Sequence, residues 1–254
     1  MHSLANKNAL VLGGTSGIGQ TVATSFCQAG ARVVIAGRRD ASVDASALGA
    51  EFLRCDMTSE QEVVDTLDIT VSKYGLLDVL VINAGMADDE GSIESYSSES
   101  MKAVMDVNFN GAFYAFKHAP NRLKDGASVI YTGSVAGSGV THAGAAVYAA
   151  SKAGGAYLMR ASAIENAPRG IRVNAVCPAL IADTGMMVAD DGNETAAFLS
   201  QLNAFGRMGR QDEITGIYNF LASDASTFIT GQEIRVDGGM TAGIGLPAFA
   251  AIGG

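Results

Sequence analysis

Short apolar runs alternate with longer amphipathic stretches from one end of the chain to the other, and this alternation limits the possible folds more than any other feature. The runs are almost continuously apolar, as in Ala9–Leu12 and Leu77–Ile82, which is typical of strands buried on both faces. Strands that are joined through helices form βα units, and their right-handed crossovers produce a parallel sheet. We therefore predict an α/β fold with a doubly wound parallel sheet of about seven strands and helices on both faces.

The order of the expected elements leaves no place for a domain boundary. The chain holds four prolines among 254 residues, and neither a linker rich in Pro, Ser or Gly nor an internal repeat divides it. A polar, methionine-bearing segment at 183–210 interrupts the pattern. We therefore predict a single domain over residues 1–254. The expected strands are 9–12, 32–36, 52–55, 77–82, 128–131, 171–176 and 233–236, and the expected helices are 18–29, 59–74, 98–123, 146–166 and 212–222.

Net charge and cysteine content argue against several kinds of partner. The formal net charge of -9 repels nucleic-acid phosphates and anionic membrane surfaces, so we expect neither as a partner. Cys27, Cys55 and Cys177 are far apart and lack metal-ligand spacing, so we predict small buried residues and no metal site. The chain shows no leader and no apolar run of about 18 residues, and we expect a cytoplasmic protein.

A glycine-rich turn, GGTSGIG at 13–19, stands between the first expected strand and the first expected helix. Unpaired N–H groups at a helix N-terminus suit a pyrophosphate, and glycine lets the backbone approach that ligand closely. The turn therefore predicts a Rossmann-like, dinucleotide-binding fold. A glycine-rich surface turn without a ligand is the alternative that the turn alone leaves open.

Two arginines follow the second expected strand, where the residue that selects the cofactor normally lies. Gly37 replaces the acidic residue that would bind a ribose 2′-hydroxyl, and the Arg38 and Arg39 guanidinium groups suit a 2′-phosphate. We therefore predict a preference for NADP over NAD. A solvated basic turn would have the same sequence, and Asp40 weakens the case. Asp56, after the third expected strand, is placed either to reach an adenine ring or to cap the next helix.

Tyr148 and Lys152 lie four residues apart near the start of an expected helix, which places both on one face. An ammonium beside a phenol favours the phenolate, so we expect Lys152 to lower the pKa of Tyr148 from about 10. Such a tyrosine exchanges a proton with an alcohol oxygen. Ser134 follows the fifth expected strand, where its hydroxyl can hydrogen-bond the same oxygen. Each residue alone has a structural explanation, but their order and placement together predict a catalytic set.

With these motifs the chain resembles the short-chain dehydrogenase/reductase family over essentially its whole length. It departs from the usual pattern at Leu12, where the family has Thr, at Ile82, where it has Asn, and at Ala179, where it has Gly. Ala179 and a lengthened stretch between Ser134 and Tyr148 lie beside the expected substrate pocket, so substrate identity stays open. The matching segments are GGTSGIG at 13–19, CDM at 55–57, INAG at 82–85, VNFNG at 107–111, TGSVAG at 132–137, YAASK at 148–152, RVNAVCP at 172–178 and VDGG at 236–239.

The resemblance implies a hydride transfer that interconverts a secondary alcohol and a ketone. By resemblance, Asn108 completes a tetrad with Ser134, Tyr148 and Lys152 and anchors a water that relays protons. Lys152 also binds the cofactor ribose, and Ser134 polarises the carbonyl oxygen. The residues implied to contact the cofactor are Gly13, Thr15, Ser16, Gly17, Ile18, Gly19, Arg38, Arg39, Asp56, Met57, Asn83, Ala84, Gly85, Tyr148, Lys152, Pro178 and Ile181.

Two apolar segments bear on the substrate and the assembly. Residues 183–210 are expected to form a lid, and its aliphatic and methionine side chains favour a neutral, apolar, cyclic or aromatic alcohol or ketone. The apolar tail, 240–254, is expected to pack near a substrate pocket or to seal a subunit interface. The family resemblance implies a homotetramer built partly on the two long helices. The lid side chains concerned are Leu180, Ile181, Met186, Met187, Val188, Phe198, Leu199 and Leu202.

Two other functions remain open at this level. A dinucleotide-binding regulator without catalysis would share the fold, although a complete Ser/Tyr/Lys set argues against it. A 3-oxoacyl-carrier-protein ketoreductase would need a basic patch for its acidic partner, and Arg122, Lys124 and Arg169 are the residues that could supply one.

Overall fold

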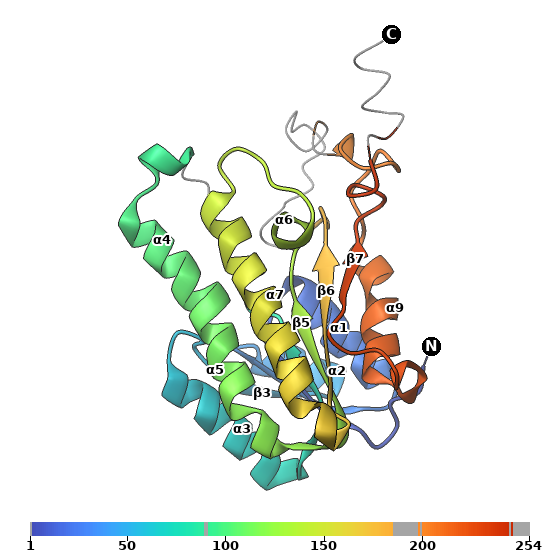
Figure 1. Ribbon diagram of the computed structural model, residues 1–254. Coiled ribbons are helices and arrows are strands. Elements are labelled where there is room, and N and C mark those ends of the chain that lie inside the picture. Colours follow the sequence, from blue (N-terminus) through green and yellow to red (C-terminus); the bar gives the residue numbers. More distant parts are fainter. Residues whose placement is uncertain (1, 89–90, 185–197, 199, 244, 246–254) are drawn as a thin grey trace.

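The computed structural model contains one sheet of seven parallel strands, as the apolar runs predict (Figure 1). The structure describes residues 2–88, 91–184, 198, 200–243 and 245. The strands lie in the order β3-β2-β1-β4-β5-β6-β7, so the chain reverses its direction of growth between β1 and β4. The strands are β1 Asn8–Leu12, β2 Arg32–Gly37, β3 Glu51–Arg54, β4 Leu77–Ile82, β5 Leu123–Thr132, β6 Arg172–Pro178 and β7 Glu233–Val236.

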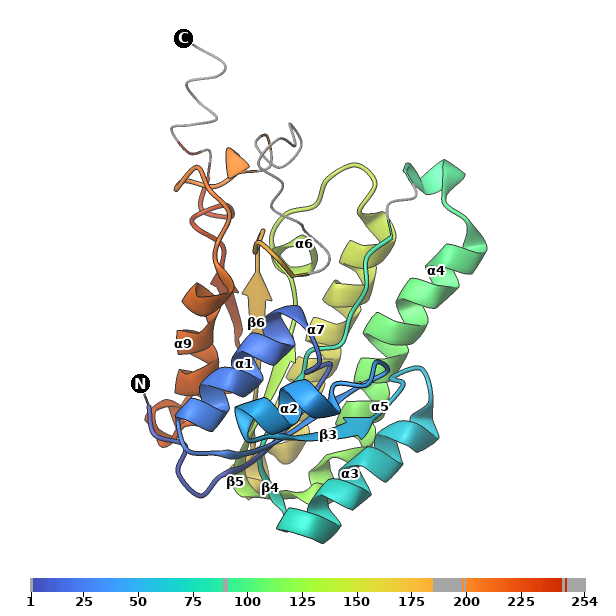
Figure 2. The same cartoon turned by 180° about the vertical axis from the view of Figure 1, so that it is seen from behind.

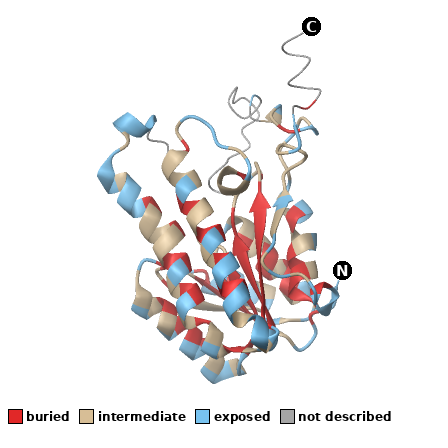
Figure 3. Cartoon of the chain, viewed as in Figure 1, coloured by how far each residue is buried: buried red, intermediate tan, exposed pale blue. Residues whose placement is uncertain are grey.

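Helices cover both faces of the sheet and bury two separate apolar layers (Figure 2). Helices α1 (Gly17–Gln28), α2 (Ser42–Leu48) and α9 (Gln211–Ala222) cover one face. The opposite face is covered by α3 (Glu60–Tyr74), α5 (Gly111–His118) and α7 (Ala146–Asn166), with α4 (Ser98–Met105) packed against α7. The central strands are buried along their length, which explains why their sequences are continuously apolar (Figure 3).

The predicted elements agree with the structure except in three places. The expected helix 98–123 is divided: α4 passes through a π-helical turn, Asp106–Asn110, into α5, and a 3₁₀ turn, Pro120–Arg122, precedes β5. Strand β5 therefore begins at Leu123, well before the expected position 128, and its pairing with β4 is irregular between Leu77 and Val79. Helices α2 and α6 (Val135–Ser138) were not predicted, because both are too short to show a helical period.

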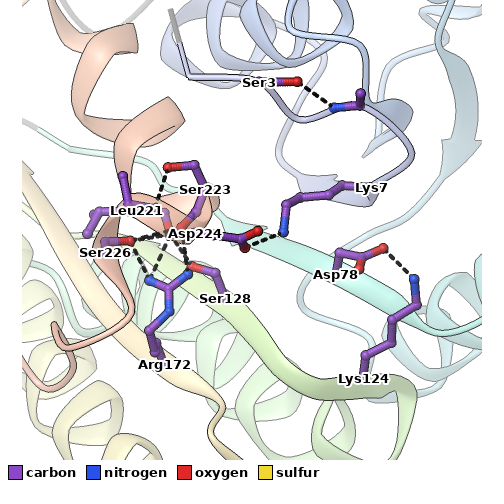
Figure 4. Close-up of polar contacts among 12 residues, drawn as sticks. Ser3, Lys7, Asp78, Lys124, Ser128, Arg172, Leu221, Ser223, Asp224 and Ser226 are labelled. Carbon is purple, nitrogen blue, oxygen red and sulfur yellow. Dashed lines mark hydrogen bonds and ion pairs between the residues drawn. The ribbon is translucent and has the colours of Figure 1, made fainter.

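Polar contacts anchor the amino ends of the strands, opposite the edge that carries the glycine turn (Figure 4). Arg172, at the start of β6, is buried and donates to the Leu221 carbonyl at 2.9 Å and the Ser223 carbonyl at 3.1 Å, at the end of α9. Lys7 pairs with Asp224 at 2.8 Å. A cation at the C-terminus of a helix stabilises its unpaired carbonyls, so Arg172 fastens α9 to the sheet.

The described residues contain neither a membrane-spanning helix nor a cluster of metal-binding side chains. None of the described helices is both long and apolar enough to cross a lipid bilayer. No group of three or more His, Cys, Asp or Glu side chains within the described ranges is arranged to hold a metal ion.

Candidate active site

The glycine turn packs directly on the loop that follows β4. Asn83 donates from Nδ2 to the Gly13 carbonyl at 2.8 Å, and the Asn83 and Ala84 backbone amides both donate to the Leu12 carbonyl. A Cβ at Gly13 would overlap the Ala84 backbone nitrogen, and Gly13 has a φ of +83°. Only glycine fits both the space and the dihedral angle. The turn is therefore built for close backbone packing at the carboxyl edge of the sheet.

The N-terminus of α1 is prepared for an anion. Its N-cap residue, Ser16, makes no side-chain capping bond, and the first turn carries no acidic residue. The first-turn amides thus keep their partial positive charge for a ligand. A Cβ at Gly19 would overlap the Gly13 carbonyl, so Gly19 allows the helix to start against the turn, beside Thr15, Ser16, Gly17 and Ile18. These residues fit the pyrophosphate that the sequence predicts.

Arg38 and Arg39 are exposed beyond the end of β2, close to the glycine turn. Arg39 donates from Nη2 to the Ser16 hydroxyl at 3.0 Å, so its guanidinium lies beside the N-cap of α1. Gly37 is needed at the end of β2, because a Cβ there would lie 2.7 Å from Thr15 Oγ1. The Arg39 guanidinium therefore lies beside the glycine turn, and the charge of Arg38 acts on Asp56. Neither arginine forms an ion pair within the described residues.

Asp56 and Met57 follow β3. Asp56 accepts hydrogen bonds from the Thr58 amide at 3.0 Å and the Thr58 hydroxyl at 2.9 Å. Burial acts to raise the pKa of Asp56, but these bonds and the charges of Arg38 and Arg54 together outweigh it, and the pKa is lowered. The N-cap of α3 is Ser59, which accepts from the Glu62 amide at 3.3 Å, so Asp56 is not the helix cap that its position allowed. Met57 is buried against the start of α5.

Asn108 lies in the π-helical turn between α4 and α5 and is almost fully buried. Its Oδ1 accepts from the Met86 amide at 2.8 Å, and its Nδ2 donates to the Met86 carbonyl at 2.8 Å and to Ser151 Oγ at 3.0 Å. The side chain therefore ties the loop after β4 to α7. A π turn is a frequent feature of functional sites because it re-aims a side chain from a continuous helix.

Lys152 is buried in α7, and its ammonium nitrogen donates to the Thr132 carbonyl at 2.9 Å. The same nitrogen lies 5.9 Å from the ring centre of Tyr148 and 5.3 Å from that of Tyr131. Burial lowers the pKa of Lys152 to about 8. A Cβ at Gly85 would lie 3.0 Å from Lys152 Nζ, so the loop after β4 reaches the lysine.

The expected effect of Lys152 on Tyr148 is absent from the structure. Burial raises the pKa of Tyr148, and the hydrogen bond with Ser134 only partly opposes this. The prediction of a lowered pKa was wrong, because desolvation of the phenol is the largest influence on its pKa. The pair shares one helix face, as the four-residue spacing predicts.

Ser134 lies between the short helix α6 and Tyr148 and interacts with both. Its Oγ accepts from the Ala136 amide at 3.1 Å and so caps α6, while its hydroxyl also hydrogen-bonds Tyr148. The short helix α6 packs against α7, and Gly137 allows this because a Cβ there would lie 2.6 Å from the Ala153 amide. Ser134, Tyr148, Lys152 and Asn108 therefore converge at the carboxyl ends of β4 and β5.

The base of the expected lid is well defined. Pro178 ends β6 opposite Val236, and Ile181, which is buried, forms a parallel bridge with Gly209. A Cβ at Gly17 would lie 2.8 Å from the Thr184 carbonyl, so the lid base touches the glycine turn. The predicted lid residues Met186, Met187, Val188 and Leu199 lie outside the described residues, as does the tail from 246 onward. Gly245, within the tail, is buried beside Ala204.

Several residues that support the tetrad were missed in the sequence. Tyr131 on β5 faces Lys152, and Ser151 accepts from Asn108 and donates to the Tyr148 carbonyl at 2.7 Å. Cys177 on β6 lies close enough to Lys152 and Tyr148 to act on both electrostatically. The strand alternation of β5 was the available signal for Tyr131, but it becomes informative only when α7 is known to cover that face.

The known proteins that this chain resembles are named as reductases and dehydrogenases. A family model described as enoyl-(acyl carrier protein) reductase matches residues 13–241. The chain is 35% identical over 249 residues to cis-4-hydroxycyclohexanecarboxylate dehydrogenase of Sinomonas cyclohexanicum, covering 95% of this chain and 99% of that protein. It is 36% identical over 249 residues to the mitochondrial borneol dehydrogenase of Lavandula x intermedia, covering 95% of this chain and 93% of that protein.

Solved structures agree with the sequence relatives. A short-chain dehydrogenase/reductase from Serratia marcescens BCRC 10948 matches with a TM-score of 0.89 at 32% identity, covering 94% of this chain and 100% of that chain. Proteins of this family generally use a nicotinamide dinucleotide, which is the ligand that the glycine turn fits. The geometry of the site and these likenesses lead to one conclusion: the chain belongs to the short-chain dehydrogenase/reductase family of oxidoreductases.

Proposed function

We propose that this protein interconverts a secondary alcohol and a ketone with a nicotinamide cofactor, and that Tyr148 is the proton donor and acceptor. The observation that carries this proposal is the convergence of Tyr148, Ser134, Lys152 and Asn108 around the loop at Gly85. A phenol hydrogen-bonded to a serine and lying beside a buried lysine is suited to exchange a proton with a substrate oxygen.

Each residue has a distinct part in the reductive direction. The cofactor, when bound, supplies the hydride that reaches the carbonyl carbon. Tyr148 gives its proton to the carbonyl oxygen, and Ser134 donates a hydrogen bond to that oxygen as negative charge develops. Lys152 stabilises the phenolate that remains and holds the ribose hydroxyls. Asn108 fixes the loop at Met86, which keeps the lysine environment in place.

The proposed cofactor is NADP. Arg38 and Arg39 are both exposed after β2, Arg39 lies beside the N-cap of α1, and β2 ends in Gly37 and not in an acidic residue. A 2′-phosphate would accept charge-assisted hydrogen bonds from one or both guanidinium groups. NAD carries a free 2′-hydroxyl at this position, and a carboxylate is the group that binds that hydroxyl best. The two arginines do not supply one.

The proposed substrate is a neutral cyclic or aromatic alcohol or ketone. Two of the relatives are named for ring alcohols, a hydroxycyclohexanecarboxylate and borneol. The segment between Arg172 and Arg207 contains no Lys or Arg, so a carboxylate would find no cation in the expected lid. Leu180 and Ile181 at the lid base are apolar. We therefore expect the neutral ring, rather than a charged substituent, to be recognised.

The basic patch that a 3-oxoacyl-carrier-protein ketoreductase would need is not available at the residues named for it. Arg122 pairs with Asp68 at 2.6 Å, Lys124 with Asp78 at 2.7 Å, and Arg169 with Asp125 at 2.8 Å. These cations are neutralised by the chain itself. They also lie near the amino end of β5, whereas Ser134 follows its carboxyl end, so an acidic carrier bound there would be far from the tetrad.

An activity screen tests the proposal. Purified protein is assayed with NADPH and with NADH against cyclohexanone, camphor and 4-oxocyclohexanecarboxylate, and the methyl ester of the last serves as its neutral matched analogue. We expect turnover that favours NADPH and favours the ester over the acid in kcat/KM. No turnover of any ketone or alcohol, while the protein still binds the cofactor, would instead support the dinucleotide-binding regulator.

A further inference from the structure

The ring of Tyr131 has no assigned part in the reaction, although it occupies a prominent place beside the tetrad. It is fully buried on β5, with the Phe116 ring 6.0 Å away between centroids and Lys152 Nζ 5.3 Å from its own centroid. We propose that Tyr131 is a positioning residue for catalysis, whose ring face holds the Lys152 ammonium in its charged form beside Tyr148. This inference rests on the proposed function, because it assigns a support to the lysine of that mechanism.

The surroundings of Lys152 show why such a support is needed. The side chain is buried, and within the described residues its ammonium has one hydrogen-bond acceptor, the Thr132 carbonyl, and no paired carboxylate. A buried, unpaired ammonium favours its neutral form. The negative face of an aromatic ring attracts a cation, most strongly where water is excluded. The Lys152 ammonium lies over two such rings, those of Tyr131 and Tyr148.

The hydroxyl of Tyr131 does not account for a tyrosine at this position. Oη is buried and has no hydrogen-bond partner within the described part of the chain, which is an unfavourable state for a polar atom. The fold also makes room for it, since a Cβ at Gly155 would overlap that oxygen. The ring is therefore the useful part of the side chain, and a phenylalanine should serve equally well.

Other titratable groups act on the same lysine and must be controlled. Tyr148 faces it from its own helix, and Cys177 faces it from β6 and would raise the lysine pKa if ionised. Burial raises the pKa of the Cys177 thiol, so this group is neutral at pH 7. Asn108, on the π-helical turn, is uncharged. Two contacts from β5 thus favour the charged lysine, the Thr132 carbonyl and the Tyr131 ring, and only the ring is a side chain that can be replaced.

The test measures the pKa of Lys152 directly in the cofactor-free protein. The chain has six lysines, so NMR of protein labelled with ¹³Cε-lysine gives few signals, and Lys152→Met assigns the one of interest. Tyr131→Phe should leave the Lys152 pKa unchanged. Pentafluorophenylalanine at position 131 keeps the ring shape but reverses its quadrupole, and it should lower that pKa by about one unit. Tyr131→Leu should act in the same direction.

Further measurements separate this role from simple packing. The alkaline limit of the reductive pH–rate profile should move with the Lys152 pKa in the fluorinated variant and stay in place in Tyr131→Phe. Cys177→Ser should leave the ranking of the variants intact. An equal Lys152 pKa with phenylalanine and pentafluorophenylalanine would overturn the inference. Because the NMR titration needs neither cofactor nor turnover, that result would leave the proposed function standing, and a failed activity screen would leave the titration valid.

Discussion

At the scale of single residues, burial sets the chemistry of the site. The pKa of Lys152 is lowered to about 8 and that of Tyr148 is raised, and desolvation is the first cause in both cases. Tyr148 and Lys152 do not form an ion pair, because the raised pKa keeps the phenol neutral. We expect a bound cofactor ribose and substrate oxygen to add hydrogen bonds to these side chains and so to favour the proton transfer proposed for Tyr148.

Replacing the phenol tests this assignment. Tyr148→Phe should reduce kcat by about a hundred- to ten-thousand-fold, since it removes the proton donor and keeps the ring beside Lys152. NADPH should bind with little change. The chain has no tryptophan, so the fluorescence of NADPH itself reports that binding without background. Near-normal turnover in this variant would contradict the mechanism, whereas lost cofactor binding would assign Tyr148 a structural part.

The two exposed arginines can be tested as a pair. Arg38→Ala with Arg39→Ala should raise the KM for NADPH by about 10- to 100-fold, because charge-assisted hydrogen bonds to the 2′-phosphate are lost. The KM for NADH should change little. Arg32→Ala, at an exposed arginine on the opposite, amino end of β2, is the matched control and should affect neither. An equal loss with both cofactors would mean that the arginines hold the turn and do not read the phosphate.

Sequence patterns predicted which residues lie together at the candidate site, but not their electrostatics. The placement of Tyr148, Lys152 and Ser134 could be predicted because spacing on a helix and position after a strand are local properties. The support from Tyr131 was not found, because it depends on which helix covers which face of β5. The direction of the Tyr148 pKa was wrong for a related reason: spacing shows a neighbour, but desolvation comes from the whole fold.

At the scale of elements, small irregularities place the site. The π-helical turn interrupts an amphipathic pattern that reads as one helix from 98 to 123, and so it was invisible in the sequence. Two adjacent glycines in α7 weaken that helix but admit neighbouring rings. A Cβ at Gly154 would lie 2.8 Å from the Phe109 ring, and one at Gly155 would overlap the Tyr131 ring. The boundaries of α7, by contrast, were predicted correctly: its N-cap, Ala145, carries no capping side chain, but Pro168 and Gly170 follow its end.

The link between α9 and β6 offers a stability test at this scale. Arg172→Met should lower the free energy of unfolding by about 2 kcal/mol, since the Ser223 and Leu221 carbonyls lose a charged donor. Arg160→Met, which breaks a partly exposed pair with Glu233, is the matched control and should cost less than about 1 kcal/mol. Urea unfolding measures both. Equal losses would show that the buried arginine contributes no more than a surface ion pair.

At the scale of the whole molecule, exposed apolar side chains on one face favour assembly. Met101 and Phe113 on α4 and α5, and Tyr157 and Ile164 on α7, are exposed, with Tyr157 at 70% and Ile164 at 77%. These helices pack together on one side of the sheet (Figure 3). Large exposed apolar side chains gathered on neighbouring helices mark an interface between proteins. Copies of this face are self-complementary in a symmetric oligomer.

We therefore expect light scattering to give the mass of a homotetramer. Tyr157→Glu with Ile164→Glu should shift the mass to a dimer or monomer, because the added carboxylates would be buried without partners. Val43→Glu, at an equally exposed apolar residue on α2 and the opposite face, should leave the mass unchanged. A monomeric mass for the unaltered chain would contradict the expectation outright.

The strand order has a consequence for how the protein is made. Each strand after the first pairs with a strand that precedes it in the chain: β2 with β1, β3 with β2, β4 with β1, and then β5, β6 and β7 each with the one before. A ribosome delivers these strands in the same order, so every newly emerged strand meets a finished edge and none waits for a partner still to be synthesised. We expect the nascent chain to have formed strands β1 to β4, and with them the glycine turn, before Tyr148 and Lys152 leave the exit tunnel. The turn that suits the pyrophosphate would then be formed before the residues proposed for proton transfer.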